Sequence, residues 1–455
     1  MDTKKLRQKI LDLAIRGKLV PQDPNDEPAS VLLERIKAEK ERLIQEGKIK
    51  RPKKSTADTS HYQNLCPNGW ICVNLGELCS IFSTGPFGSM VHKSDYVEKD
   101  GVPLVNPINI SNGIVSKKKL MMVSEEKATE LHRYKLNRDD IVIARRGDLS
   151  KCAIITEIEE GWLCGTGSFF LHIPLVEPKY FELFYLSDYM QSKLDKECVG
   201  ATMNNLNQGV LGNVLFMLPP HAEQKRILSE VQKWFSLIDT LKESREDLFQ
   251  IIEKTKAKVL DLAIQGELAL QNPSEEPAIE LLKRINPNIK IPCDNPHYQK
   301  LPVGWSMCRL EDIVDYEQPQ AYIVESTDYS DDYDIPVLTA GKTFIIGYTN
   351  EETGICDNLP VIIFDDFTTD SKYVEFPFKV KSSAMKILRV RRGIDIKYVA
   401  AFMAITRLIG KTHKRYWISE YSKIEIPIPP QKEQERIIMA IEQITARLNS
   451  ITTML

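Results

Sequence analysis

Residues 9–36 read KILDLAIRGKLVPQDPNDEPASVLLERI, and residues 258–285 read KVLDLAIQGELALQNPSEEPAIELLKRI. The two stretches align without a gap at a shift of 249, and 17 of the 28 positions are identical. Each has Leu and Ile at helical spacing, then a glycine, Gly17 or Gly266, then a proline-containing loop and a second helix. The chain therefore contains a duplicated helix–loop–helix segment.

Two further repeats mark the ends of larger domains. PPHAEQKRI at 219–227 recurs as PPQKEQERI at 429–437, and in each copy two prolines end an extended segment just before a helix. The tripeptide HYQ, followed shortly by GW, begins at His61 and again at His297. These positions indicate where two domains begin and end.

The order of the repeats predicts a circular arrangement. In the middle of the chain the PP motif is followed directly by the helix–loop–helix segment, whereas at the termini this order is cut. Residues 430–455 match the front of the middle region and residues 1–47 match its back, so we expect the two termini to lie together. The apolar stripe from Glu223 to Ile264 needs a partner helix, which the joined termini would supply. The alternative is that this helix packs on its own globular domain.

The predicted fold class is α+β. Short β-branched and aromatic runs, such as DIVIA at 140–144 and PVIIF at 360–364, alternate with Gly, Asn, Asp and Pro, and short helices are expected at 178–194 and 396–410. Two mixed α/β domains are thus separated by two long antiparallel coiled-coil helical regions in a pseudo-two-fold circular repeat. The predicted boundaries are 1–59 and 429–455 for the distal helical region, 60–218 for domain 1, 219–296 for the central helical region and 297–428 for domain 2.

Composition excludes some classes of protein. The chain has 455 residues, of which 42% are hydrophobic and 27% charged, and it lacks a long uncharged apolar run or an apolar leader. We expect a cytoplasmic protein with no membrane contact. The net charge of −3 does not by itself indicate a nucleic-acid binder, but the chain has 60 Lys and Arg residues that can gather on one face. The 9 cysteines include no Cys-x-x-Cys pair, so they are predicted to be reduced, buried thiols with no metal site.

The chain resembles the specificity subunits of type I restriction-modification enzymes over nearly its whole length. The motifs that carry the resemblance are LDLAIRGKLV at 11–20, its partner at 260–268, the PPxxEQxRI helix starts at 219 and 429, and the segments 136–148 and 336–343. The resemblance implies two target-recognition domains, each reading half of a bipartite double-stranded DNA site. It also implies helical regions that act as spacer and as docking surface for two modification (methyltransferase) subunits, with two restriction subunits in the complex. The chain itself would hold no cofactor, whereas its partners would use S-adenosylmethionine, ATP and Mg.

DNA binding needs cations for phosphates and amide, hydroxyl or guanidinium groups for base edges. Lysine runs can equally be solvated faces, and Asn-rich segments can be turns. Asp365 and Asp366 either accept from cytosine amino groups or orient basic neighbours, since a carboxylate facing DNA is otherwise costly. Lys379 and Lys386 are further phosphate candidates. The predicted DNA contacts are Ser83, Thr84, Phe87, Lys93, Arg145, Arg146, Asn204, Asn205 and Asn207 in domain 1, and Thr339, Lys342, Thr343, Thr368, Thr369, Lys372, Lys381 and Arg415 in domain 2.

The sequence carries no ATP-binding Gly-x-x-x-x-Gly-Lys-Ser/Thr loop and no Asn-Pro-Pro-Tyr/Phe adenine-methylation motif. We therefore expect no catalytic residues in this chain. Two rivals stay open: a self-contained methyltransferase or nuclease with diverged motifs, and a coiled-coil scaffold that binds proteins but no nucleic acid.

Overall fold

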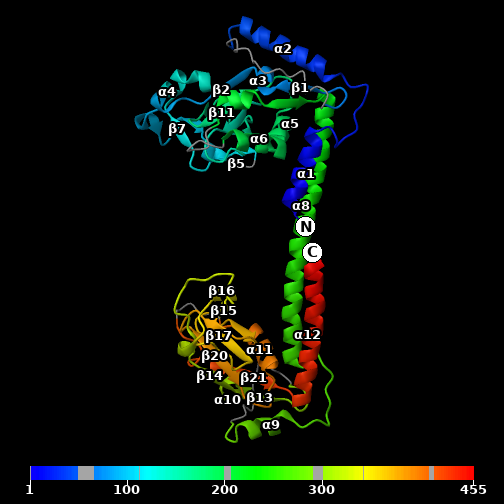
Figure 1. Ribbon diagram of the computed structural model, residues 1–455, viewed down its shortest axis with the longest axis vertical. Coiled ribbons are helices and arrows are strands. Elements are labelled where there is room, and N and C mark those ends of the chain that lie inside the picture. Colours follow the sequence, from blue (N-terminus) through cyan, green and yellow to red (C-terminus); the bar gives the residue numbers. More distant parts are fainter. Residues whose placement is uncertain are drawn as a thin grey trace. The chain divides into compact units, whose positions relative to one another are not determined.

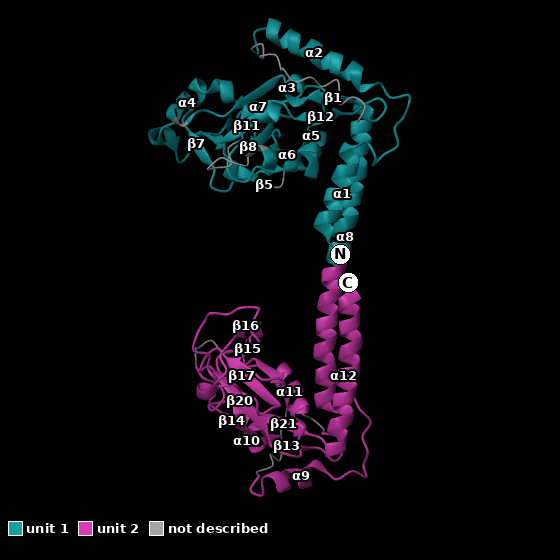
Figure 2. Ribbon diagram, in the orientation of Figure 1, with its two compact units in different colours: residues 1–243 teal, residues 244–455 magenta. Residues whose placement is uncertain are grey.

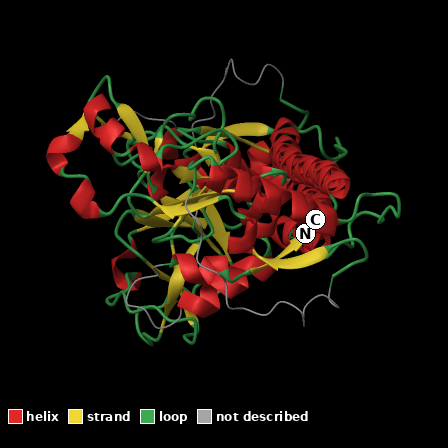
Figure 3. Ribbon diagram, turned by 90° about the horizontal axis from the view of Figure 1, so that it is seen from above, coloured by secondary structure: helices red, strands yellow, loops and turns green. Residues whose placement is uncertain are grey.

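The computed structural model describes residues 2–49, 66–111, 113–198, 206–289, 301–341, 343–408 and 414–454. The chain divides into two compact units, Met1–Glu243 and Ser244–Leu455 (Figure 2). Both helices and strands are present throughout (Figure 3). None of the described helices combines the length and the apolar character needed to cross a membrane.

Unit 1 combines small sheets with helices. Its helices are α1 (Thr3–Ile15), α2 (Ala29–Gln45), α3 (Leu75–Leu78), α4 (Glu125–Glu130), α5 (Pro178–Leu186), α6 (Asp188–Cys198), α7 (Gln208–Gly212) and the first part of α8 (His221–Gln265). Its strands are β1 (Ile71–Asn74), β2 (Ile81–Thr84), β3 (Tyr96–Val97), β4 (Val102–Val105), β5 (Ile110–Ser111), β6 (Ile114–Val115), β7 (Met121–Val123), β8 (Ile141–Ala144), β9 (Cys152–Ile154), β10 (Leu163–Cys164), β11 (Ser168–His172) and β12 (Leu215–Leu218).

Unit 2 begins within α8, the long helix labelled in Figure 1, where the colour changes in Figure 2. Its other helices are α9 (Ala278–Ile285), α10 (Leu310–Ile313), α11 (Ile396–Ile405) and α12 (Gln431–Met454). Its strands are β13 (Ser306–Arg309), β14 (Val314–Glu317), β15 (Ile335–Leu338), β16 (Ile345–Thr349), β17 (Val361–Asp365), β18 (Ser371–Val374), β19 (Lys379–Val380), β20 (Met385–Val390) and β21 (Glu425–Ile428).

The two units have matching four-stranded sheets and similar second sheets, but unit 1 adds strand β3 to its second sheet and has a separate β5–β6 pair. A four-stranded antiparallel sheet has the order β2-β11-β8-β9 in unit 1 and β14-β20-β17-β18 in unit 2. A second sheet contains one parallel pair, β4 with β10 or β15 with β19, and an antiparallel neighbour, β7 or β16. The first and last strands of each domain pair with each other, β1 with β12 and β13 with β21. The two mixed domains predicted from the sequence therefore share one frame.

Duplicated aromatic contacts hold this frame. Trp70 meets Tyr180 edge-on at 6.4 Å and 79°, and Trp305 meets Tyr398 at 6.4 Å and 77°. The hydroxyl of Tyr180 donates to a carbonyl of β12 at 3.1 Å, and that of Tyr398 donates to a carbonyl of β21 at 2.8 Å. Edge-to-face rings stabilise a core beyond the area that they bury.

Duplicated ion pairs tie each proline-containing loop to the helix that follows the domain. Arg226 on α8 donates to both carboxylate oxygens of Asp26, at 3.1 and 2.5 Å. Arg436 on α12 does the same to Glu275, at 2.6 and 3.1 Å. The fork of a guanidinium fits a carboxylate through two parallel hydrogen bonds, so these pairs fix both distance and orientation.

The long helix predicted from Glu223 to Ile264 is present as α8, which has 45 residues. In unit 1 its buried Ile227, Val231 and Ile238 share a core with the apolar face of α1, and Arg7 of α1 lies over the Phe235 ring. In unit 2 the end of α8 shares a core with α12. The second helices of the repeat, α2 and α9, begin directly after a proline as predicted.

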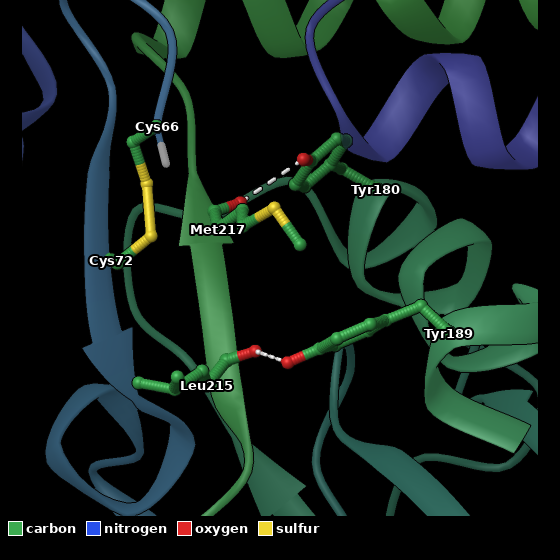
Figure 4. The surroundings of a disulfide bond; sticks show 6 residues. All are labelled: Cys66, Cys72, Tyr180, Tyr189, Leu215 and Met217. Atoms are coloured by element: carbon green, nitrogen blue, oxygen red, sulfur yellow. Dashed lines mark hydrogen bonds between the residues drawn. A yellow bond between two sulfur atoms is a disulfide. The ribbon is translucent and has the colours of Figure 1, made fainter. Parts of the chain in front are cut away.

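The cysteine prediction was wrong for one pair, since Cys66 and Cys72 form a disulfide bond (Figure 4). Gly69, with a φ of +80°, lies in the turn between them, and their Cα atoms are 6.5 Å apart, within the range that a disulfide spans. Spacing alone had suggested no such pairing. The other cysteines whose side chains are described are free and buried: Cys79, Cys152, Cys164, Cys308 and Cys356. Cys293 and the side chain of Cys198 lie outside the description.

Candidate nucleic-acid interface

In unit 1, several loops leave the four-stranded sheet at one end. Strand β2 ends at Thr84, which pairs with Phe169, and β8 ends at Ala144, which pairs with Ser168 at the start of β11. The loops after β2 and after β8 and the loop before β11 therefore emerge together. We name these loops, with residues 206–207, the loop edge of unit 1.

Most of the predicted contacts of domain 1 gather at this edge. Phe87 is 60% exposed, Arg146 is exposed, and Ser83 and Thr84 are half-buried at the end of β2. Asn207 is exposed and its side chain accepts from the Val210 amide, so it caps α7. Helix α7 is tied to β2 because Gln208 donates to the Phe82 carbonyl at 2.6 Å.

Three predicted contacts of domain 1 are not placed at this edge. Lys93 is exposed but lies in a short 3-10 turn that leads to β3. Asn204 and Asn205 lie outside the described residues. The prediction that Asn204 and Asn205 contact DNA rests on the sequence alone.

Unit 2 has the corresponding edge. Strand β14 ends at Glu317, which pairs with Ile387, and β17 ends at Asp365, which pairs with Met385 at the start of β20. The loops after β14 and β17 and the loop before β20, with residues 415–417, form the loop edge of unit 2. Phe367, 40% exposed, and the exposed Thr368 lie in the β17–β18 loop, and exposed Lys372 follows on β18.

The parallel strand pair brings further candidates to the same side. Thr339 follows β15 and Lys381 follows β19, and the Lys381 amide donates to the Leu338 carbonyl at 3.2 Å. The hydroxyl of Thr339 donates to the Thr343 carbonyl at 2.8 Å, which fixes the turn between β15 and β16. Lys381 and Thr343 are exposed, whereas Lys342 lies outside the described residues.

Two remaining candidates differ in exposure. Arg415 is exposed next to the buried Tyr416, whose amide donates to the Asp366 carbonyl at 2.9 Å. Thr369 is fully buried with a φ of +59°, and its hydroxyl accepts from the Leu408 amide at 3.1 Å. Because Thr369 is buried, it stabilises the shape of the loop. Arg415 is exposed and can therefore reach a ligand.

Buried charges explain the acidic residues of this loop. Asp365 accepts from the amides of Phe367 and Thr368, at 2.8 and 3.0 Å, and so closes the turn. Asp366 is 2% exposed and pairs with Lys386, which is 1% exposed, at 3.3 Å. Asp366 thus has a basic partner as expected, whereas Asp365 accepts from backbone amides.

Two lysines offered as phosphate candidates cannot serve as such in this structure. Lys386 is buried in the pair just described, and Lys379, 3% exposed, pairs with Glu351 at 2.7 Å. Burial of a charged lysine is tolerated because each has its own carboxylate. Strand position alone did not distinguish these inward-facing side chains from outward-facing ones.

Sequence reasoning missed Asn106, which lies against the loop before β11 and so beside the loop edge of unit 1. It follows β4 as Thr339 follows β15, and a Cβ added to Gly165 would lie 2.3 Å from its Oδ1 atom. The signal was present, since VPLVN at 102–106 and IPVLT at 335–339 are similar apolar runs that end in a polar residue.

Both loop edges thus present exposed cations with hydroxyl or amide groups, and each carries one exposed phenylalanine. Such groups can meet phosphates and base edges. Among the described residues, no group of three or more His, Cys, Asp or Glu side chains could hold a metal ion. The family model described as type I restriction modification DNA specificity domain matches residues 67–249 and 302–454. The first match covers most of unit 1 and ends shortly after Ser244, and the second lies in unit 2. The chain belongs to this family.

Individual relatives support the assignment. The type I restriction enzyme EcoAI specificity subunit of Escherichia coli is 24% identical over 98% of this chain and 90% of that protein. The EcoR124I/EcoR124II specificity subunit of Escherichia coli is 44% identical, but the match covers only 35% of this chain and 41% of that protein. A solved structure from a study of complex assembly and conformational transition of the type I R-M system shares the fold, with a TM-score of 0.53 at 18% identity, over 85% of this chain and 92% of that one.

As a specificity subunit, the chain is a DNA-recognition component rather than an enzyme. The resemblance drawn from the repeats is therefore confirmed at the level of the family. The duplicated match also accords with the two domains, whose four-stranded sheets have corresponding strand orders.

Proposed function

We propose that this specificity subunit reads a bipartite double-stranded DNA site, with residues 60–218 reading one half-site and residues 297–428 the other. The observation that carries the proposal is the pair of loop edges, which have the same topology and different side chains. A shared frame with different surface chemistry is what two readers of two different sequences require.

We assign four of the contacts by exposure and keep the others from the sequence. Arg146, Lys372, Lys381 and Arg415 meet phosphates or guanine edges, because they are exposed cations in or beside the loop edges. The other proposed contacts are Ser83, Thr84, Phe87, Lys93, Asn204, Asn205, Asn207, Thr339, Lys342, Thr343 and Thr368. Arg145 and Thr369, which are turned toward the protein, serve the interface by shaping it.

The helical regions act as spacer and docking surface in this proposal. Residues 1–59 and 429–455 complete one antiparallel coiled-coil region, and residues 219–296 form the other, in a circular two-fold repeat. The duplicated contacts Arg226–Asp26 and Arg436–Glu275 support equivalent roles for the two halves. The 45 residues of α8 span roughly 68 Å at about 1.5 Å per residue, which suits a spacer between half-sites.

The remaining partners follow from the family. Two modification subunits dock on the helical regions and bring S-adenosylmethionine, and two restriction subunits use ATP and Mg. The complex works in the cytoplasm, where its DNA lies.

Adenine-methylation mapping of a whole genome tests the proposal. One host expresses the chain with its modification subunit, and the control host expresses the modification subunit alone. A new bipartite motif with a fixed gap, present only in the first host, is the expected result. A stable complex that adds no motif would favour the protein scaffold, and methyl transfer or cleavage by the purified chain alone would favour the enzyme.

A further inference from the structure

The residue that follows the central strand β8 in unit 1 is Arg145. Its amide donates to the Gly167 carbonyl at 2.8 Å, and its carbonyl accepts from the Leu206 amide at 3.0 Å. Its side chain turns back onto the protein, since Nε donates to the Leu206 carbonyl at 3.1 Å and the guanidinium lies 5.7 Å from the centre of the Phe169 ring. Arg145 thus ties the segment that leads to α7 to the β8–β9 loop.

The equivalent residue in unit 2 is Asp366, directly after β17. Its amide donates to the Ala384 carbonyl at 2.9 Å, and its carbonyl accepts from the Tyr416 amide at 2.9 Å. One carboxylate oxygen accepts from the Trp417 amide at 2.7 Å, and the other pairs with Lys386 at 3.3 Å. Asp366 therefore ties the corresponding segment to the corresponding loop.

The backbone hydrogen bonds of the two residues match one for one, whereas their side chains have opposite charges. Because the side-chain charge at this position is opposite in the two units, the charge is not their common feature. The common element is the attachment of a distant segment, at Leu206 or at Tyr416, to the loop edge.

We propose that Arg145 and Asp366 are equivalent positioning residues that hold the loop edges in shape and do not themselves contact DNA. The proposal rests on the proposed function and deepens it, because it separates Arg145 from its exposed neighbour Arg146, which makes the contact. Asp366 is not accessible to a base, since it is 2% exposed and its two carboxylate oxygens face the Trp417 amide and Lys386.

In unit 1 the test compares Arg145→Gln with Arg146→Gln in the complex with modification subunits. Affinity for cognate DNA is measured by fluorescence anisotropy over a range of salt concentrations. Loss of a phosphate contact lowers the slope of log K against log salt by about 1, whereas loss of positioning leaves the slope unchanged. Arg146→Gln should lower the slope, and Arg145→Gln should weaken binding several-fold at an unchanged slope.

Hydrogen exchange of the DNA-free complex gives an independent readout. Amide exchange at 206–212 should accelerate in Arg145→Gln and not in Arg146→Gln, because only Arg145 bonds to Leu206. A slope change in Arg145→Gln equal to that of Arg146→Gln, or unaltered exchange, overturns the positioning role. Absence of salt-dependent DNA binding by the wild-type complex would instead refute the proposed function, since the exchange result does not depend on DNA.

In unit 2 the test is a double-mutant cycle. Asp366→Asn keeps an acceptor for the Trp417 amide but leaves the Lys386 charge buried without an anion, so binding and selectivity at one half-site should fall. Adding Lys386→Met removes the buried charge with a side chain of similar length, and it should restore most of the lost binding and selectivity. A double variant as defective as Asp366→Asn would show that the carboxylate itself reads DNA.

Discussion

Replacement of Gly17 by alanine should destabilise unit 1 far more than an ordinary glycine substitution. Gly17 ends α1 with a φ of +63°, and an added Cβ would lie 2.6 Å from Cγ of Pro67 and 3.1 Å from Cζ2 of Trp70. Gly266 is its duplicate, with a φ of +74° and a Cβ position 2.4 Å from Cγ of Pro302. At both positions a rigid proline ring meets the helix end, so little can move aside.

Two costs add in the Gly17→Ala variant. A left-handed backbone costs a residue with a Cβ about 1–2 kcal/mol. Forcing a methyl group into a packed contact costs about 1–3 kcal/mol more. The expected loss is therefore about 2–5 kcal/mol. Gly47→Ala is the matched control, because Gly47 has a φ of +70° and no atom within 4 Å of the added Cβ, so only the backbone cost of about 1–2 kcal/mol applies.

Hydrogen exchange with mass spectrometry on the full chain measures the effect by segment. The free energy of opening should fall in α1 and β1 for Gly17→Ala, while segments of unit 2 keep their protection. Gly266→Ala should show the reverse pattern. If Gly17→Ala costs no more than Gly47→Ala, the close approach to Pro67 does not constrain this position and the reasoning fails.

Three other predictions concern the buried and paired groups. Burial raises the pKa of Glu223, so the folded state keeps this proton at pH values where the unfolded chain has lost it, and stability should fall as pH rises from the ordinary glutamate pKa through the raised one. In Glu223→Gln the urea midpoint should depend less on pH across that window. Wild-type and variant midpoints that change in parallel with pH would contradict the assignment. Arg226→Ala and Arg436→Ala should each destabilise their own unit by about 1 kcal/mol, since these pairs are partly exposed, and urea unfolding should show equal effects for the two. Burial raises the pKa of Cys79 to about 12, so iodoacetamide at neutral pH should leave Cys79 unlabelled in the native chain and label it in urea; labelling in the native chain would show that the site opens.

The two mixed domains and the helices beside them could be predicted from the sequence because their motifs occur twice. The duplicated glycines, prolines and helix starts carry the same contacts twice, so each copy supported the interpretation of the other. The starts of α2, α9 and α12 followed from prolines whose physical effect is local.

The loop edges were only partly predictable. Arg146 and Thr368 each follow an apolar strand and are exposed at the loop edge of their own unit, a position that the pattern of strand ends predicts. Their contact with DNA stays a prediction. The inward orientation of Lys386 and Lys379 could not be recognised, since it depends on carboxylates from distant segments, Asp366 and Glu351. The Cys66–Cys72 bond depends likewise on a turn whose geometry spacing alone does not specify.

The attachment of a distant segment at the positioning residues Arg145 and Asp366 has an evolutionary consequence. The two backbone hydrogen bonds of each residue need only main-chain N–H and C=O groups, which every amino acid except proline supplies, so this attachment can persist where the side chain has changed. Two domains descended from one ancestor can therefore drift until pairwise alignment no longer detects their kinship, while their strand order persists. Genes for such proteins can explore new DNA preferences by changing surface loops, with the scaffold inherited intact.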